Sequence, residues 1–148
     1  MFFSIPIAFA VSIASADTKI PTVKAYVAKH KQIAIEEMHR THVPASIILS
    51  QDIIESNRGT SHLARKKHNY FGVKSGSTYK VYKNFAQSVI DHSNILKSQK
   101  RYASLFKLSS GDYKQWARGL YHAGYASNPR YPKLLISCIE QYHLNQYD

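Results

Sequence analysis

The stretch PASIILSQDIIES, residues 44–56, decides the fold of this chain. Its large aliphatic residues fall on nearly every side of a helix, so the helix has no polar face to turn toward water. A helix of this kind lies at the centre of a domain. Pro44 suits its first turn, and Gly59 is expected to end it. The sequence therefore predicts one buried helix around which the rest of the chain packs.

A single carboxylate, Glu55, stands at the end of this helix. No other Asp or Glu follows until Asp91, and the 35 residues between them contain seven Lys or Arg. Burial against the isoleucines would raise the pKa of Glu55 and nearby cations would lower it, so the sequence leaves that balance open. Glu55 is thus a candidate for proton transfer, with a helix-terminal ion pair to Arg58 or Lys66 as the alternative.

Most of the remaining sequence has helical spacing. Apolar residues recur every three or four positions over 23–41, and a short helix is expected over 61–67. Asn84 is a predicted cap with Gln87 reaching back to it, and further helices follow. Turn formers and alternating residues between 69 and 83 predict a short hairpin or extended loop. We expect one mainly α domain with a small hairpin lobe.

Charge and cysteine content limit the classes of partner and chemistry. The net charge is +11, which favours polyanions such as nucleic acid, anionic lipid surfaces or bacterial wall polymers. Cys138 is the only cysteine, so the sequence offers no internal disulfide. It lies on the apolar stripe of the last predicted helix, which favours a core residue over a nucleophile.

Residues 1–16 have the features of a signal peptide. They carry no charge, are too short to span a bilayer as a stop-transfer helix, and end in the small-x-small pattern Ala14-Ser15-Ala16. The n-region lacks the usual Lys or Arg, and an uncleaved hydrophobic anchor is the alternative. We expect cleavage before Asp17, a mature domain over 17–148, and a secreted or cell-envelope protein (periplasmic or extracellular). Export argues against nucleic acid as the partner.

A set of short segments carries a family resemblance. They include the central helix, the NYFGVK turn at 69–74, the AGYA segment at 123–126 and the PRY segment at 129–131. In their order along residues 33–148, these segments resemble the core of the bacterial glucosaminidase family, glycoside hydrolase family 73. The resemblance implies an α+β lysozyme-like fold with a hairpin lobe beside a substrate groove. It also implies an endo-β-N-acetylglucosaminidase that cleaves the β-1,4 bond between N-acetylglucosamine and N-acetylmuramic acid in peptidoglycan.

The resemblance also assigns roles to residues. The family's catalytic acid corresponds to Glu55 and its groove tyrosine to Tyr125. Aromatic rings can stack on sugars and amides can bind acetamido groups, so the predicted substrate-binding residues are Phe71, Asn69, Tyr131 and Tyr79. The expected partner is a peptidoglycan glycan strand, bound by a monomer that uses no metal and no cofactor and has no stable membrane span after processing.

One departure from the family pattern affects the mechanism. The family's hairpin lobe is usually longer and carries a second Glu, whereas residues 73–82 contain no acid and Ser77 stands at roughly that position. A two-carboxylate mechanism would need another acid near Glu55. Two interpretations remain: the substrate's own 2-acetamido group acts as nucleophile, or the protein is weakly active or inactive and mainly binds glycan.

Other classes leave different signatures. A lytic transglycosylase also uses a Glu-Ser pair but usually follows it with Gly-Leu-Met-Gln, where this chain has Asn69-Tyr70-Phe71-Gly72. A zinc amidase needs three protein ligands, and no His-Glu-x-x-His pattern occurs. A peptidoglycan-binding module without activity is the main alternative to an enzyme.

Overall fold

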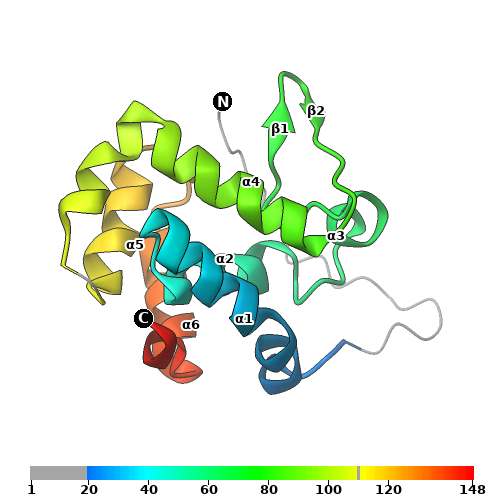
Figure 1. The fold of residues 1–148 in the computed structure, drawn as a ribbon, viewed down its shortest axis with the longest axis horizontal. Helices are drawn as coiled ribbons and strands as arrows, with labels where there is room; N and C mark the ends of the chain where they lie inside the picture. The colour runs from blue at the N-terminus through cyan, green and yellow to red at the C-terminus, as the bar shows by residue number, and fades with distance from the viewer. Residues whose placement is uncertain (1–19, 110) are drawn as a thin grey trace.

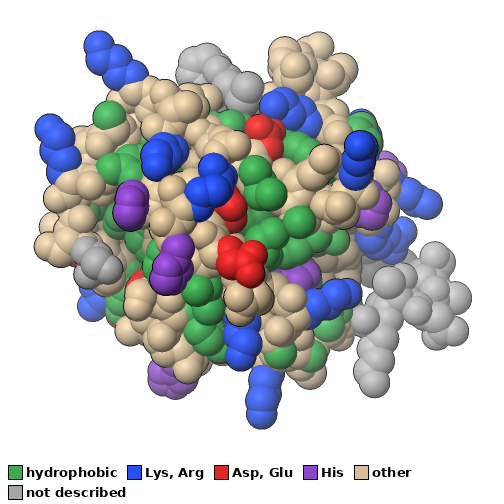
Figure 2. All heavy atoms as spheres, viewed as in Figure 1, with side chains coloured by type: hydrophobic (Ala, Val, Ile, Leu, Met, Phe, Trp, Pro, Cys, Tyr) green, Lys and Arg blue, Asp and Glu red, His purple; other side chains and the backbone are tan. Residues whose placement is uncertain are grey.

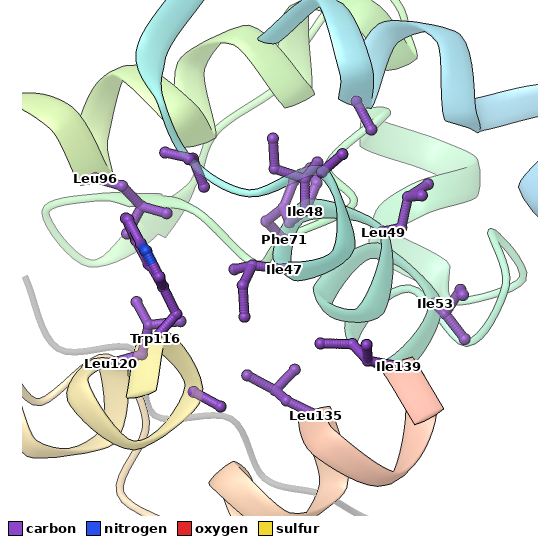
Figure 3. Close-up of a cluster of buried hydrophobic side chains, with 14 of the residues drawn as sticks. Ile47, Ile48, Leu49, Ile53, Phe71, Leu96, Trp116, Leu120, Leu135 and Ile139 are labelled. Atoms are coloured by element: carbon purple, nitrogen blue, oxygen red, sulfur yellow. The ribbon is translucent and has the colours of Figure 1, made fainter. Parts of the chain in front are cut away.

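The predicted central helix is α2 (Ala45–Glu55) of a computed structural model that describes residues 20–109 and 111–148. Ile47, Ile48 and Leu49 on this helix are each at most 1% exposed. Figure 3 shows that side chains from several elements close around α2. They are Phe71 from a loop, Leu96 from α4 (Phe85–Ser98), Trp116 and Leu120 from α5 (Tyr113–His122), and Leu135 and Ile139 from α6 (Tyr131–Gln141).

Helix α1 (Val23–Thr41) packs against α2 and α4 and has the bounds predicted for it. The Thr22 side chain accepts a hydrogen bond from the Ala25 amide and so caps its first turn. At the other end His42 adopts a left-handed conformation, with a φ of 69°, and its amide donates to the Met38 carbonyl. This sharp end turns the chain directly into α2.

The small lobe consists of α3 (His62–Lys67) and a hairpin of strands β1 (Lys74–Ser75) and β2 (Thr78–Tyr79). The strands are antiparallel, with Lys74 opposite Tyr79, and the hairpin projects from the helical body (Figure 1). Asp91 of α4 accepts hydrogen bonds from Lys80 Nζ at 2.9 Å and from the Tyr82 hydroxyl at 2.6 Å. Asp91 therefore fastens the base of the hairpin to the helical body.

Two details of the helices after the hairpin differ from the sequence prediction. Asn84 does cap α4 by accepting from the Gln87 amide, but the Gln87 side chain accepts from the Lys83 amide and not from that of Asn84. A 3-10 helix, η1 (Lys100–Lys107), follows α4 and was not predicted. Its Leu105 lies so close to α5 that a Cβ on Gly119 would come within 2.1 Å of it.

The end of the described chain supports the start of the central helix. After α6 the 3-10 helix η2 (Leu144–Tyr147) packs on α2. Asp148 then accepts hydrogen bonds from the amide and the hydroxyl of Ser46, at 2.8 and 2.7 Å. The carboxylate of Asp148 thus acts as the cap of α2, since Pro44 at the N-cap position offers no side-chain hydrogen bond.

The mainly α fold with a two-stranded hairpin lobe is confirmed. The predicted signal peptide, residues 1–16, lies outside the described residues. Within the part of the chain that the structure does describe, no helix is both long and apolar enough to cross a membrane.

Candidate active site

Glu55 is the last residue of α2, four residues earlier than the predicted end at Gly59. The chain leaves the helix there because Asn57, Arg58 and Gly59 all have positive φ angles, of 49°, 53° and 74°. Ser56 stabilises this turn, since its hydroxyl accepts from the Gly59 amide at 2.8 Å. The early end leaves the Glu55 side chain partly exposed at the edge of the core instead of inside a continuing helix.

Two tyrosines hold the carboxylate of Glu55. The Tyr131 hydroxyl donates to Oε1 at 2.9 Å, and the Tyr125 hydroxyl donates to Oε2 at 3.2 Å. Their rings stack with centroids 5.7 Å apart and an interplanar angle of 22°. Both tyrosines are at most 1% exposed. One donor on each oxygen fixes the orientation of the carboxylate.

Local structure brings these tyrosines to the site. Gly124 adopts a φ of 83° after α5, and the Tyr125 amide then donates to the Leu120 carbonyl at 2.9 Å. This helix-ending turn folds Tyr125 back onto the core. Tyr131 is the first residue of α6, where its amide donates to the carbonyl of Asn128. The rigid ends of two helices therefore position both hydroxyl groups.

Burial raises the pKa of Glu55 to about 8. The Tyr131 and Tyr125 hydrogen bonds lower this pKa, and the charge of Asp52 one turn earlier raises it, but loss of solvent has the largest effect. The balance that the sequence left open thus favours the protonated acid at neutral pH. The neighbouring tyrosines have pKa values raised well above their usual value by the same burial, so they stay protonated as donors.

Asp52 is fully buried and belongs to a different hydrogen-bond network. It accepts from the Tyr26 hydroxyl at 2.7 Å, and its other oxygen lies 2.7 Å from Nδ1 of His30. The Ser56 hydroxyl also lies 3.4 Å from Oδ1 of Asp52. These contacts join α1 to α2, so Asp52 has a structural position and no exposed oxygen.

The other described carboxylates also have partners outside the Glu55 site. Each is held by a neighbouring side chain or by a helix end, so none of those in residues 20–109 and 111–148 is placed as a second acid beside Glu55. They are Glu36 with Gln32, Glu37 with Arg40 and Ser93, Asp91 with Lys80 and Tyr82, Asp112 as the cap of α5, Glu140 with Tyr113 and Lys114, and Asp148 with Ser46.

The positions of Phe71 and Asn69 correct two sequence predictions. Phe71 is fully buried and stacks on His92, with ring centroids 4.0 Å apart, so it has no face to offer a sugar. Asn69 is 1% exposed and binds the backbone of Val73 and Lys80 through both ends of its amide. The first packs the core and the second closes the base of the hairpin. Neither position suits substrate binding.

Tyr79 and Ser77 lie in the hairpin. Tyr79 is partly exposed on β2, and Lys74 Nζ lies 4.9 Å from its ring centroid. Ser77 is exposed in the turn after Gly76, which adopts a φ of 61°. The turn is too short to carry an additional acidic segment toward the helical body, which is consistent with the absence of acid in this lobe.

One residue of the site was missed by sequence reasoning. Gln51 is fully buried, and its Nε2 donates to the Tyr131 hydroxyl at 2.9 Å. The signal was available, because Gln51 stands four residues before Glu55 and so on the same face of α2. The sequence does not show that Tyr131 packs beside Gln51, so no role for Gln51 could be inferred from its position alone.

A pocket of about 200 Å³ lies elsewhere, at the opposite end of α2. Pro44, Met38, Phe106 and Trp116 are among its lining residues, and Glu55 is not. An 11-residue helix spans roughly 16 Å, so this pocket is remote from the tyrosines. Its lining includes His42 and Asp148, which lie at the start of α2 and so at the other end of the helix from Glu55.

Several known proteins are similar to this chain in sequence. The family model described as mannosyl-glycoprotein endo-beta-N-acetylglucosaminidase matches residues 31–144. The exo-glucosaminidase LytG of Bacillus subtilis (strain 168) is 31% identical, over 80% of this chain and 50% of LytG. The peptidoglycan hydrolase FlgJ of Escherichia coli (strain K12) is 27% identical, over 80% of this chain and 46% of FlgJ. The chain spans about half the length of the curated relatives it matches.

Solved structures agree with the fold. The glycoside hydrolase domain of FlgJ from Salmonella typhimurium superposes with a TM-score of 0.70 and 26% identity, over 83% of this chain and 89% of that domain. The catalytic domain of the autolysin Auto from Listeria monocytogenes superposes with a TM-score of 0.77, over 93% of this chain and 92% of that domain. At 20% identity the second match supports the fold alone.

Proposed function

This chain belongs to the glucosaminidase family, glycoside hydrolase family 73, and on that premise we propose that it cleaves the β-1,4 bond between N-acetylglucosamine and N-acetylmuramic acid in peptidoglycan. The observation that carries the proposal is the state of Glu55. The residue is partly exposed at the edge of the core, and its carboxyl is oriented by two tyrosines and has a pKa raised to about 8. A general acid of a glycosidase needs these properties.

The proposed role of Glu55 is to protonate the leaving oxygen. At neutral pH the group is mostly protonated, so it can give its proton as the bond from the anomeric carbon to that oxygen breaks. Glu55 then becomes a carboxylate in a poorly solvated place. The hydroxyl groups of Tyr131 and Tyr125 donate to its two oxygens, and such bonds strengthen when the acceptor gains charge. The tyrosines thus favour the transition state over the ground state.

The second catalytic group in this proposal is the substrate's own acetamido group. Its carbonyl oxygen bonds to the anomeric carbon as the leaving oxygen takes the proton of Glu55. Water then attacks the same carbon, the bond from that carbon to the acetamido oxygen breaks and restores the acetamido group, and the Glu55 carboxylate accepts the proton of that water. The described carboxylates other than Glu55 hydrogen-bond to partners outside this site, so we assign the second role to the substrate. Substrate assistance is a known exception to the two-carboxylate rule.

The substrate and location follow from the same proposal. A chain with a net charge of +11 suits an anionic wall polymer, and Tyr79 on the hairpin is proposed to contact the glycan. Residues 1–16 are proposed to direct export before cleavage at Ala16, which places the domain in the cell envelope or outside the cell as a monomer.

Product analysis tests this function. Purified peptidoglycan is digested with the full chain, and the fragments are separated and weighed by mass spectrometry. The proposal expects fragments that end in reducing N-acetylglucosamine, with retained β configuration in the first product detected by NMR. Reducing muramic acid would indicate a muramidase, and anhydro-muramic acid a transglycosylase. Binding to the peptidoglycan without any fragments would support the binding-module alternative.

A further inference from the structure

Gln51 and Glu55 are joined by a short hydrogen-bonded chain through Tyr131. Gln51 Nε2 donates to the Tyr131 hydroxyl at 2.9 Å, and that hydroxyl donates to Glu55 Oε1 at 2.9 Å. Gln51 is fully buried and Tyr131 is 1% exposed. Gln51 lies one helical turn before Glu55 on α2, whereas Tyr131 comes from α6. The chain therefore spans two helices within the core.

The direction of these hydrogen bonds follows from the number of protons. A tyrosine hydroxyl has one proton to donate, and burial raises the pKa of Tyr131 so that it keeps this proton. The amide of Gln51 donates to the hydroxyl, so the hydroxyl proton must point away from the amide and toward Oε1. Gln51 Oε1 is buried and has no hydrogen-bond partner among the described residues. Reversing the amide would put the NH₂ group in that place, where neither of its two protons would have an acceptor, so the present orientation leaves fewer donors unpaired.

We propose that Gln51 is a positioning residue, which locks the Tyr131 hydroxyl as a donor to Oε1 of Glu55 and so reserves Oε2 as the oxygen that carries the proton to the substrate. A proton on Oε1 would meet the proton of Tyr131, and Tyr131 cannot turn away without meeting the protons of the Gln51 amide. Among the described residues Oε2 has the longer contact, 3.2 Å to the Tyr125 hydroxyl, and that hydroxyl must turn its proton away when Oε2 is protonated. This inference rests on the proposed role of Glu55 as general acid.

Other titratable groups act on Glu55 but do not select an oxygen in this way. Asp52 on α2 raises its pKa through charge, and Tyr102 on η1 is close enough for the charge of Glu55 to affect the pKa of Tyr102. Tyr125 contacts Oε2 itself. Gln51 is uncharged, so replacing it changes the orientation of the Tyr131 hydroxyl without adding or removing a charge.

The test combines two variants in the full chain. Gln51→Leu keeps the side-chain bulk and removes the amide, and Tyr131→Phe removes the hydroxyl. The pKa of Glu55 is read by ¹³C NMR of its labelled carboxyl, and kcat and KM are measured on peptidoglycan fragments. We expect Gln51→Leu to raise the pKa of Glu55 by about one pH unit, because the Tyr131 hydroxyl is no longer held as a donor to the charged form. We also expect kcat to fall while KM stays nearly unchanged. In the Tyr131→Phe background, Gln51→Leu should change neither quantity further.

Controls separate positioning from general damage. Gln141→Leu at the exposed end of α6 should leave the pKa of Glu55 unchanged. If Gln51→Leu does not fold, Gln51→Met serves instead, because it keeps the length of the side chain, adds no charge and has no amide proton to donate to Tyr131. An unchanged pKa in the folded Gln51 variant, or additive effects of Gln51→Leu and Tyr131→Phe, would overturn the inference. The NMR readout needs no turnover, so loss of the proposed function would appear separately, as normal activity of Glu55→Gln.

Discussion

The Tyr125 hydroxyl lies 3.2 Å from Oε2 of Glu55, although 70 residues separate the two in the chain. This contact joins the end of the central helix to the turn between α5 and α6. It matters because Glu55 and Tyr125 are the two residues proposed for the chemistry, and the structure brings them into direct contact. The Tyr125 ring also stacks on Tyr131, so the contact is backed by the core.

Tyr125→Phe is expected to keep the fold and to lower kcat by about 10²-fold. Removing one hydrogen-bond donor that stabilises a developing charge has an effect of about this size in other enzymes. The ring stays, and only the hydroxyl bonded to Oε2 is lost. The basic limb of the pH–rate profile should also move to higher pH, because this hydrogen bond lowers the pKa of Glu55.

Tyr113→Phe is the matched control for that variant. The Tyr113 hydroxyl donates to Glu140 on the surface, at 3.1 Å, so its loss should leave turnover and the pH profile nearly unchanged. Equal kinetics for the two variants would remove Tyr125 from the site.

The stability of the protein should fall with rising pH because of Glu55. Its pKa is raised from 4.5 to about 8 on folding, so the folded state holds this proton more tightly than the unfolded state. The resulting loss of stability begins above about pH 4.5 and is complete above about pH 8. Glu55→Gln cannot ionise, so its Tm should exceed that of the wild type at pH 8, by roughly 4 °C per kcal/mol relieved, and match it near pH 4. Calorimetry showing a lower Tm for Glu55→Gln at pH 8 would mean that Glu55 is a structural carboxylate.

Asp52→Asn should lower the stability of the protein and leave its turnover nearly unchanged. Asp52 holds Tyr26 and His30 through two 2.7 Å contacts, and leaving a buried hydrogen-bonding group without its partner typically costs about 1–3 kcal/mol. Urea unfolding should reveal that loss, while the folded fraction keeps near-normal kcat. A folded Asp52→Asn protein without turnover would revive a two-carboxylate mechanism.

Binding to isolated sacculi should weaken as salt is raised. Lys and Arg side chains are spread over the face drawn in Figure 2, with few Asp or Glu among them, and such exposed charges act over a Debye length of about 10 Å at 0.1 M salt. Sedimentation with sacculi at low salt and at 1 M salt measures the effect. Neutral chitin oligomers are the control, since their binding should depend little on salt. Equal retention on sacculi at both salt concentrations would assign binding to aromatic stacking.

The central helix, the Asn84 cap and the hairpin could be predicted because each depends on a local sequence pattern. The isoleucines of α2 require burial wherever they fall, and Asn84 caps α4 through contacts within a single turn. The role of Phe71 could not be predicted, because neighbouring residues in a turn can face either way. Tyr70 is partly exposed, whereas Phe71 stacks on His92 from α4. Asn69 and Gln51 were misjudged or missed for the same reason, since their partners are set by tertiary packing.

The role of Glu55 as general acid is tested by the turnover of Glu55→Gln on purified peptidoglycan, beside the wild type and at matched folded concentration. Gln keeps the size of the side chain and can still meet Tyr131 and Tyr125, but it has no proton to give to the leaving oxygen. We expect the wild type to release fragments ending in reducing N-acetylglucosamine, and Glu55→Gln to bind the same sacculi but release no fragments above background. If a folded Glu55→Gln protein releases fragments as fast as the wild type does, Glu55 is not the general acid.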